Sequence, residues 1–247
     1  MPDLPLWKYI LGAFCAFNIG VAKTGMPGLG ILAIPLFVVT VGDARLSAGW
    51  LLPILLSADV FAVFYYRRHA AAGRLFSLLP SVAIGLALGS FMLRFDDRVL
   101  RPIVGGIILS MLLLYLIRKR SVNPLPTEGK LYTALYGSFA GFATMIANAA
   151  GPVMNIYLLS KRLTREEFVA TGAWFFFLVN LSKIPVYLNH GLISSKSLTF
   201  DAILLPASIS GALLGRRLLA LMPEKVFEWS VIVLAFIATG VLFIPNR

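Results

Sequence analysis

Three ionisable side chains stand inside long apolar stretches of the sequence: Lys23, Asp59 and Lys183. A charge in hydrocarbon costs about 2.5–3.5 kcal/mol on insertion scales, so such residues usually line a substrate path or pair with one another. Together the three side chains carry a net charge of +1. A cavity with one surplus positive charge suits an anion better than a metal cation.

Each of these residues also has an explanation that involves no substrate. Lys183 stands about six residues, or roughly 9 Å, from the end of its apolar segment, so its side chain could instead extend to the membrane surface. Lys23 could lie at the end of a helical hairpin near that surface. Asp59 is too short to reach it, and its alternative role is a structural ion pair with one of the lysines. The sequence leaves these alternatives open.

The chain interrupts two apolar segments with glycine and proline. The first, "GVAKTGMPGLGILAIPL", begins at Gly20, and the second, "NAAGPVMNIY", begins at Asn148. Proline suits the first turn of a helix, so we predict helix restarts at Pro27-Gly28 and Gly151-Pro152. A helix N-terminus presents unpaired N–H groups and a positive dipole end, which favours anions. The predicted substrate-binding residues are Lys23, Thr24, Gly28, Asn148, Gly151, Asn155, Asn180 and Lys183, with Asp59 as an ion-pair or coupling residue.

Composition places the chain in a membrane. Hydrophobic residues make up 59% of its 247 residues and charged residues 13%, with a mean hydropathy of +0.86. The segments Leu75–Met92 and Pro102–Ile117 contain no charge. The net charge of +11 resides mostly in short connections, which argues against a nucleic-acid partner. A single cysteine, Cys15, excludes a disulfide framework. We predict no metal and no cofactor.

The sequence matches itself at a separation of about 125 residues. Gly20 aligns with Gly141, Asp59 with Lys183, and Pro80 with Pro206. We therefore predict an all-α polytopic membrane protein built from two inverted repeats, each a broken-helix hairpin followed by three transmembrane helices. Residues 1–120 contain hairpin 6–41 and spans 46–66, 75–93 and 101–117; residues 121–247 contain hairpin 131–159 and spans 168–189, 200–221 and 226–244. A hairpin crosses an even number of times whether its limbs span or re-enter, so each half crosses an odd number of times and the second half is inverted.

The basic residues predict the orientation. One side of the predicted membrane holds more of them, and they are Arg67, Arg68, Arg74, Arg118, Lys119, Arg120, Lys130, Lys161, Arg162, Arg165, Arg216, Arg217 and Lys225. The richer side is expected to be cytoplasmic. Both termini are therefore predicted on the other side of the cell inner membrane.

Four stretches carry a resemblance to a known family, and they are "GVAKTGMPGLGILAIP", "LPILLSADVFAVFYYRR", "ANAAGPVMNIYLLSKRL" and "ATGAWFFFLVNLSKIPVY". Over essentially its whole length the chain resembles the TauE/SafE sulfite exporters, also called the toluene sulfonate uptake permeases. The resemblance implies two repeated halves and the movement of sulfur-containing or other small organic anions. Many members carry a longer glycine run after the first break, where Ile31 and Leu32 stand here.

The primary hypothesis is an anion transporter with a midplane site that works by alternating access. An inside-negative potential favours anion exit by about 2.3 kcal/mol per charge per 100 mV, so we expect an exporter. The alternative is proton-coupled uptake, with Asp59 as the only carboxylate deep enough to carry the proton. A channel or a non-transporting assembly partner is the alternative from another class. We expect no enzyme, because no paired cysteines, His-Glu metal motif or serine–histidine pair appears. The expected partners are a small anion and the lipid bilayer. The sequence does not determine the oligomeric state.

Overall fold

The structure, a computed structural model, describes residues 4–93, 95, 106, 109–110, 113, 116–117 and 129–243. The predicted span 101–117 therefore lies largely outside the described residues, as do the basic residues Arg118, Lys119 and Arg120. In the described part the elements are all helical, and they are α1 (Leu6–Thr24), α2 (Gly30–Val41), α3 (Ala44–Tyr66), the 3-10 turn η1 (Arg67–His69), α4 (Ala72–Met92), α6 (Lys130–Ala147), α7 (Ala150–Ser160), α8 (Arg165–Asn189), α9 (Ser195–Leu221) and α10 (Glu224–Phe243).

The all-α membrane class predicted from composition is confirmed. Four helical segments of the described chain are long and apolar enough to cross a membrane, and they are Arg45–His69, Ala72–Met92, Arg165–Asn189 and Ser195–Leu221. Side chains that replace missing backbone partners mark where α3 and α8 begin. The Asp43 carboxylate accepts from Leu46 N at 2.7 Å at the start of α3, and Thr164 with Glu167 forms a capping box at the start of α8.

Both apolar hairpins are broken, and the second limb of each is short. α2 has 12 residues and α7 has 11, which gives roughly 18 and 16 Å at 1.5 Å per residue. Neither crosses the roughly 30 Å of a bilayer core alone. α7 begins where predicted, with Pro152 in its first turn. α2 begins at Gly30, later than the predicted restart, because Gly28 has a φ of +110°, which no helix accommodates.

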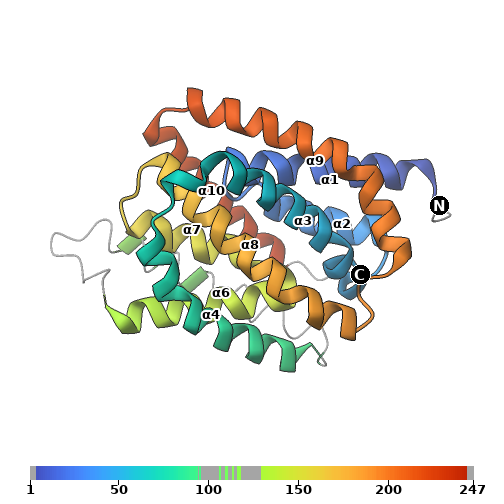
Figure 1. Cartoon of the computed structure of the whole chain (residues 1–247), viewed down its shortest axis with the longest axis horizontal. Helices are drawn as coiled ribbons and strands as arrows, with labels where there is room; N and C mark the ends of the chain where they lie inside the picture. Colours follow the sequence, from blue (N-terminus) through green and yellow to red (C-terminus); the bar gives the residue numbers. More distant parts are fainter. Residues whose placement is uncertain are drawn as a thin grey trace.

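The first limb of each hairpin packs along one long helix (Figure 1). α1 lies along α9, α6 lies along α4, and α3 packs against α8 between these pairs. Glycines permit the close approach. A Cβ added to Gly211 would lie 2.0 Å from the Phe17 carbonyl oxygen, and one added to Gly85 would lie 2.0 Å from that of Ser138. Small residues four apart serve helix packing of this kind in membranes.

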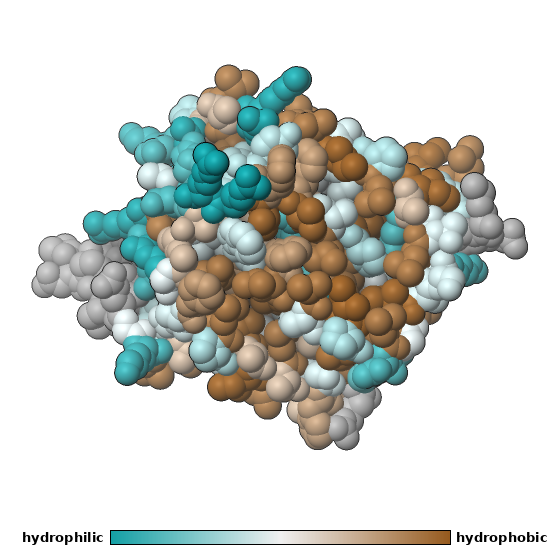
Figure 2. Space-filling view, in the orientation of Figure 1, coloured by the Kyte–Doolittle hydropathy of each residue, from teal (hydrophilic) through white to brown (hydrophobic). Residues whose placement is uncertain are grey.

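Basic connections meet at one end of the molecule. Arg74 Nη1 donates to Lys161 O at 2.7 Å, which ties the start of α4 to the end of α7. Arg165 Nη1 donates to Leu219 O at 3.3 Å, which ties the start of α8 to the end of α9. Figure 2 shows hydrophilic residues gathered where α9 ends (upper left), whereas apolar residues cover much of the remaining face. Outward-facing leucines and phenylalanines of this kind suit contact with lipid.

Candidate functional site

A buried ion pair lies between the first broken hairpin and α3. Lys23 Nζ is 2.7 Å from Asp59 Oδ1; the Asp59 side chain is fully buried, and the Lys23 side chain is 13% exposed. The other Asp59 oxygen accepts from Asn180 Nδ2 at 2.6 Å. The Lys23 ammonium also lies 3.8 Å from the centre of the Phe176 ring, a cation–π contact. The ion pair proposed as the alternative role of Asp59 is therefore present.

Lys183 lies in the protein interior and does not extend to the membrane surface. It is 0% exposed. Its ammonium donates to Asn148 Oδ1 and, at 3.4 Å, to Thr144 Oγ1 and Asn180 Oδ1. The surface-reaching alternative for Lys183 is therefore wrong. These partners are amides and a hydroxyl, which supply no negative charge, so the surplus positive charge of the three-residue set is centred on Lys183.

Asn180 joins the two lysine environments into one network. Its Nδ2 donates to Asp59 and its Oδ1 accepts from Lys183. Beyond Lys183, Asn148 Nδ2 donates to Ala48 O at 3.2 Å. Asn148 is held at the break between α6 and α7 by a left-handed backbone, with φ of 51°. Polar contacts therefore run from the break of the first hairpin, across α3 and α8, to the break of the second.

Aligned positions of the two halves make the same kind of contact. Thr144 follows Gly141 by three residues, as Lys23 follows Gly20. Lys23 binds Asp59, and Thr144 binds Lys183, the residue aligned with Asp59. In each half, the last helical turn before the break therefore contacts the polar residue of the following long helix. Thr144 was missed as a candidate, although extending the self-alignment by three residues identifies it.

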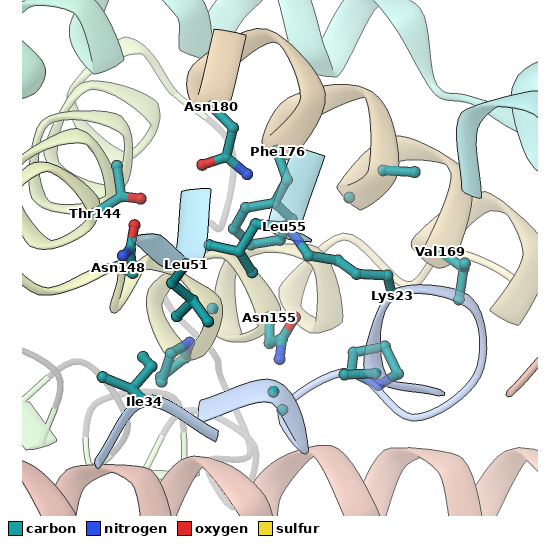
Figure 3. Close-up of a pocket in the computed structure, with 18 of the residues that line it drawn as sticks. Lys23, Ile34, Leu51, Leu55, Thr144, Asn148, Asn155, Val169, Phe176 and Asn180 are labelled. Carbon is teal, nitrogen blue, oxygen red and sulfur yellow. The ribbon is translucent and has the colours of Figure 1, made fainter. Parts of the chain in front are cut away.

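A cavity of about 90 Å³ lies where the two breaks face α3 and α8 (Figure 3). Six of the predicted site residues line it, and they are Lys23, Gly28, Asn148, Gly151, Asn155 and Asn180. The sequence did not single out most of the other lining residues, which include Ile34, Leu51, Leu55, Thr144, Phe168 and Phe176. Phe176 belongs to a run of three phenylalanines, and nothing in that run shows which ring faces Lys23. The wall is thus largely apolar, with a few convergent polar groups.

Three predicted site residues do not line the cavity. The Thr24 hydroxyl donates to Ala212 O at 2.7 Å and lies between α1 and α9, so the structure does not place Thr24 as a ligand. Asp59 and Lys183 lie one side chain behind the wall, where they hold Lys23, Asn148 and Asn180.

Asn155 is the polar residue best placed to meet a ligand. It is 3% exposed and points into the cavity in Figure 3. Among the described residues no side-chain hydrogen bond of Asn155 is found, so its amide is available to a molecule in the cavity. Gly151 lies one turn earlier on α7, where an added Cβ would meet no atom within 4 Å. The first turn of α7 and the Asn155 amide therefore both face open space.

Asp201 is a second buried carboxyl, which the sequence analysis did not single out. Asp201 of α9 is 3% exposed, and neither of its oxygens has a hydrogen-bond partner in the described part of the chain. Burying an unsatisfied carboxyl is unfavourable. The sequence signal was the position of Asp201 within the 200–221 span, seven residues after Ser194.

Asp201→Leu is expected to stabilise the protein. Asp201 precedes Pro206 by five residues, as Leu75 precedes Pro80, and Leu75 is buried. Leucine thus occupies the aligned position of the first half. The substitution removes the unfavourable burial of an unpaired carboxyl, which costs about 1–3 kcal/mol of folding free energy. We therefore expect the melting temperature in detergent to rise by several degrees. A lower melting temperature would show that Asp201 has a stabilising partner.

The geometry suits the binding of a small anion. One ammonium and three side-chain amides converge on an apolar cavity beside the N-terminus of α7, and a second ammonium lies behind it. In the described residues, no group of three or more histidines, cysteines or acidic residues could hold a metal ion.

Comparison with known proteins gives the family. The family model of the sulfite exporter TauE/SafE proteins matches residues 11–242, nearly the whole chain. Comparisons with curated proteins and with solved structures gave no match. A match of this extent, over a chain of apolar helices with a charged central cavity, identifies the protein as a member of the TauE/SafE sulfite exporter family of membrane transporters.

Proposed function

We propose that this protein exports a small sulfur-containing or organic anion of the sulfite and sulfonate class across the cell inner membrane. The observation that carries the proposal is the cavity between the two helix breaks, with Lys23 in its wall and Lys183 behind it. Its volume of about 90 Å³ is several times the roughly 10–15 Å³ that a cavity needs to hold one water molecule. That space suits an anion of a few heavy atoms.

The packing of the hairpins supports a mechanism of alternating access. α1 of the first half packs on α9 of the second, and α6 of the second half packs on α4 of the first. Two inverted repeats would produce this reciprocity. We propose that residues 1–120 and 121–247 are such repeats, and that α3 and α8 shift past each other to open the cavity to either side. Broken helices at corresponding positions mark the binding site in transporters of this kind.

The direction of anion transport follows from the distribution of basic residues, which sets the orientation of the protein in the membrane. With the basic end cytoplasmic, both termini face outward. The membrane potential then drives an anion out by about 2.3 kcal/mol per charge per 100 mV, so export requires no coupling ion.

Anion flux in proteoliposomes tests the proposal. Sulfite, sulfonates, sulfate and small carboxylates would be offered under an imposed membrane potential to the wild type, to Lys183→Met and to Lys196→Met. Lys196 is an exposed lysine at the start of α9 and serves as the matched control. We expect saturable, voltage-driven flux that Lys183→Met loses and Lys196→Met keeps.

Other outcomes would contradict the proposal in distinct ways. Flux without saturation or counter-exchange would indicate a channel. No flux for any anion would favour a non-transporting assembly partner. Normal flux in Lys183→Met would remove Lys183 from the site.

The ion pair supports one alternative, proton-coupled uptake. An anion that reaches Lys23 competes with Asp59 for the same ammonium, and a displaced Asp59 carboxylate in a dry site gains from binding a proton. Asp59→Asn would then abolish the pH dependence of uptake. Uptake whose pH dependence survives Asp59→Asn would eliminate this alternative.

A further inference from the structure

A second concave surface lies at the basic end of the molecule, away from the central cavity. It is a groove of about 650 Å³ between the end of α3, the start of α8 and the last turns of α9. The groove is lined by Tyr66, Glu166, Ser210, Leu213, Leu214, Arg216, Arg217, Leu219 and Ala220. Nothing in the proposed transport mechanism uses it.

The polar part of the groove carries both signs of charge. Arg216 and Arg217 lie at one end of α9, and Glu166 faces the same groove from the first turn of α8. The Arg216 guanidinium lies 4.3 Å from the centre of the Tyr65 ring, which holds it in place. In the described part of the chain, neither arginine forms an ion pair with a carboxylate. Two guanidiniums and one carboxylate therefore remain available to a ligand with a phosphate and an ammonium.

The apolar part of the groove continues along α9 toward the membrane. Leu213 and Leu214 are 45% and 41% exposed, and they lie within one turn of Arg216 and Arg217. A molecule in the groove would thus meet charge at one end and exposed leucines next to it. This order matches an amphiphile whose head group lies at the membrane surface and whose chains enter the hydrocarbon.

We propose that the groove binds an aminophospholipid, a phospholipid with a primary amine in its head group such as phosphatidylethanolamine. The phosphodiester contacts the guanidiniums of Arg216 and Arg217, which suit phosphate oxygens. The ammonium contacts Glu166, and one acyl chain lies on Leu213 and Leu214. Basic pockets between transmembrane helices on the cytoplasmic side are typical lipid head-group sites.

The Glu166 carboxylate distinguishes lipids with an amine from lipids without one. An anionic lipid without an amine would place its head group beside Glu166 and gain nothing from it, whereas an aminophospholipid gains an ion pair. Tyr66, which lines the groove, donates from its hydroxyl to Thr24 O at 3.0 Å. A lipid that packs on Tyr66 therefore also stabilises the last turn of α1, so binding should raise thermal stability.

Lipid binding to the purified protein in detergent tests this inference. Phosphatidylethanolamine, phosphatidylglycerol and phosphatidylcholine with identical acyl chains would be titrated, with native mass spectrometry and melting temperature as readouts. Soluble glycerophosphoethanolamine, which lacks acyl chains, would be titrated in parallel. The variants are Arg216→Gln/Arg217→Gln and Glu166→Gln, with Arg68→Gln as the control, since Arg68 is an exposed arginine outside the groove.

We expect phosphatidylethanolamine to bind most tightly and to raise the melting temperature. The double arginine variant should weaken both phosphatidylethanolamine and phosphatidylglycerol about tenfold or more. Glu166→Gln should remove the preference for phosphatidylethanolamine without weakening phosphatidylglycerol. If the double variant does not fold, the two single arginine variants carry the same comparison.

Three results would overturn the inference. The first is wild-type affinity in the double arginine variant. The second is tighter binding of phosphatidylglycerol than of phosphatidylethanolamine by the wild type. The third is binding of the soluble head group as tight as that of the lipid. The second result would indicate a general anionic-lipid site and the third a site for a free phosphodiester.

Discussion

Lys23→Met is expected to abolish anion flux and to destabilise the protein. The ammonium is the charged group in the cavity wall, and a hydrogen bond to a charged group contributes about 1.5–3 kcal/mol. Its loss should weaken anion binding about 100-fold, since each 1.4 kcal/mol is tenfold in affinity, which leaves no flux above that of liposomes without protein. The substitution also leaves the fully buried Asp59 carboxylate without its ion pair. Removal of one partner of a buried pair costs about 3–5 kcal/mol.

The double variant Lys23→Met/Asp59→Asn separates the two effects. It removes the ion pair as a whole and keeps an amide that can still contact Asn180, so no unpaired charge remains buried. We expect its melting temperature to recover most of what Lys23→Met loses, while its flux stays absent. Flux that recovers together with stability would show that Lys23 serves folding only and would remove it from the substrate site. Lys8→Met, at a partly exposed position in the first turn of α1, is the control for losing a lysine from the same helix.

Gly85→Ala is expected to be among the most destabilising small substitutions in the protein. An added Cβ would lie 2.0 Å from Ser138 O and 2.8 Å from Phe142 N, and both are backbone atoms of α6. Backbone atoms cannot rotate away from a clash as side-chain atoms can, so α4 and α6 would have to separate along their contact. Overpacked cores typically lose about 1–3 kcal/mol, and we expect this variant at or above the upper end.

Gly73→Ala is the matched control, because Gly73 lies in the same helix with no atom near an added Cβ. Alanine is favoured over glycine in a helix by up to about 1 kcal/mol, so this variant should be as stable as the wild type or more so. Both variants would be compared by thermal unfolding in the same detergent. Equal melting temperatures for the two would contradict the close contact of α4 with α6.

The spacing of glycines indicates this packing from the sequence alone, because residues four apart lie on one face of any helix. Residues four apart share a face, so Gly85 with Gly89 and Gly211 with Gly215 had to form small-residue faces wherever these helices went. The contacts that an added Cβ would make at Gly85 and Gly211 confirm this interpretation. The partner helices were not predictable, because a flat face on one helix fits many others.

The sequence also determined which residues could carry the chemistry. A charge inside an apolar segment is unfavourable whatever the fold. The positions of Lys23, Asp59 and Lys183 inside such segments therefore identified them from the sequence alone. Helix breaks are local as well, because glycine and proline act on their own backbone. Asp201 was missed because it stands near the end of its span, where a carboxylate is equally compatible with a position at the water interface.

Only the tertiary structure decided how those residues are paired and which of them face the cavity. Asp59 lies between two lysines in the sequence, yet its contact is with Lys23, while Lys183 is held by amides and a hydroxyl. Thr24 follows Lys23 directly but points to α9, because successive helical residues diverge by about 100°. Pairing across helices depends on distances between segments far apart in the chain. The local sequence therefore shows which polar groups are available inside the apolar segments. The packing of α3 against α8 determines which of these groups contact one another.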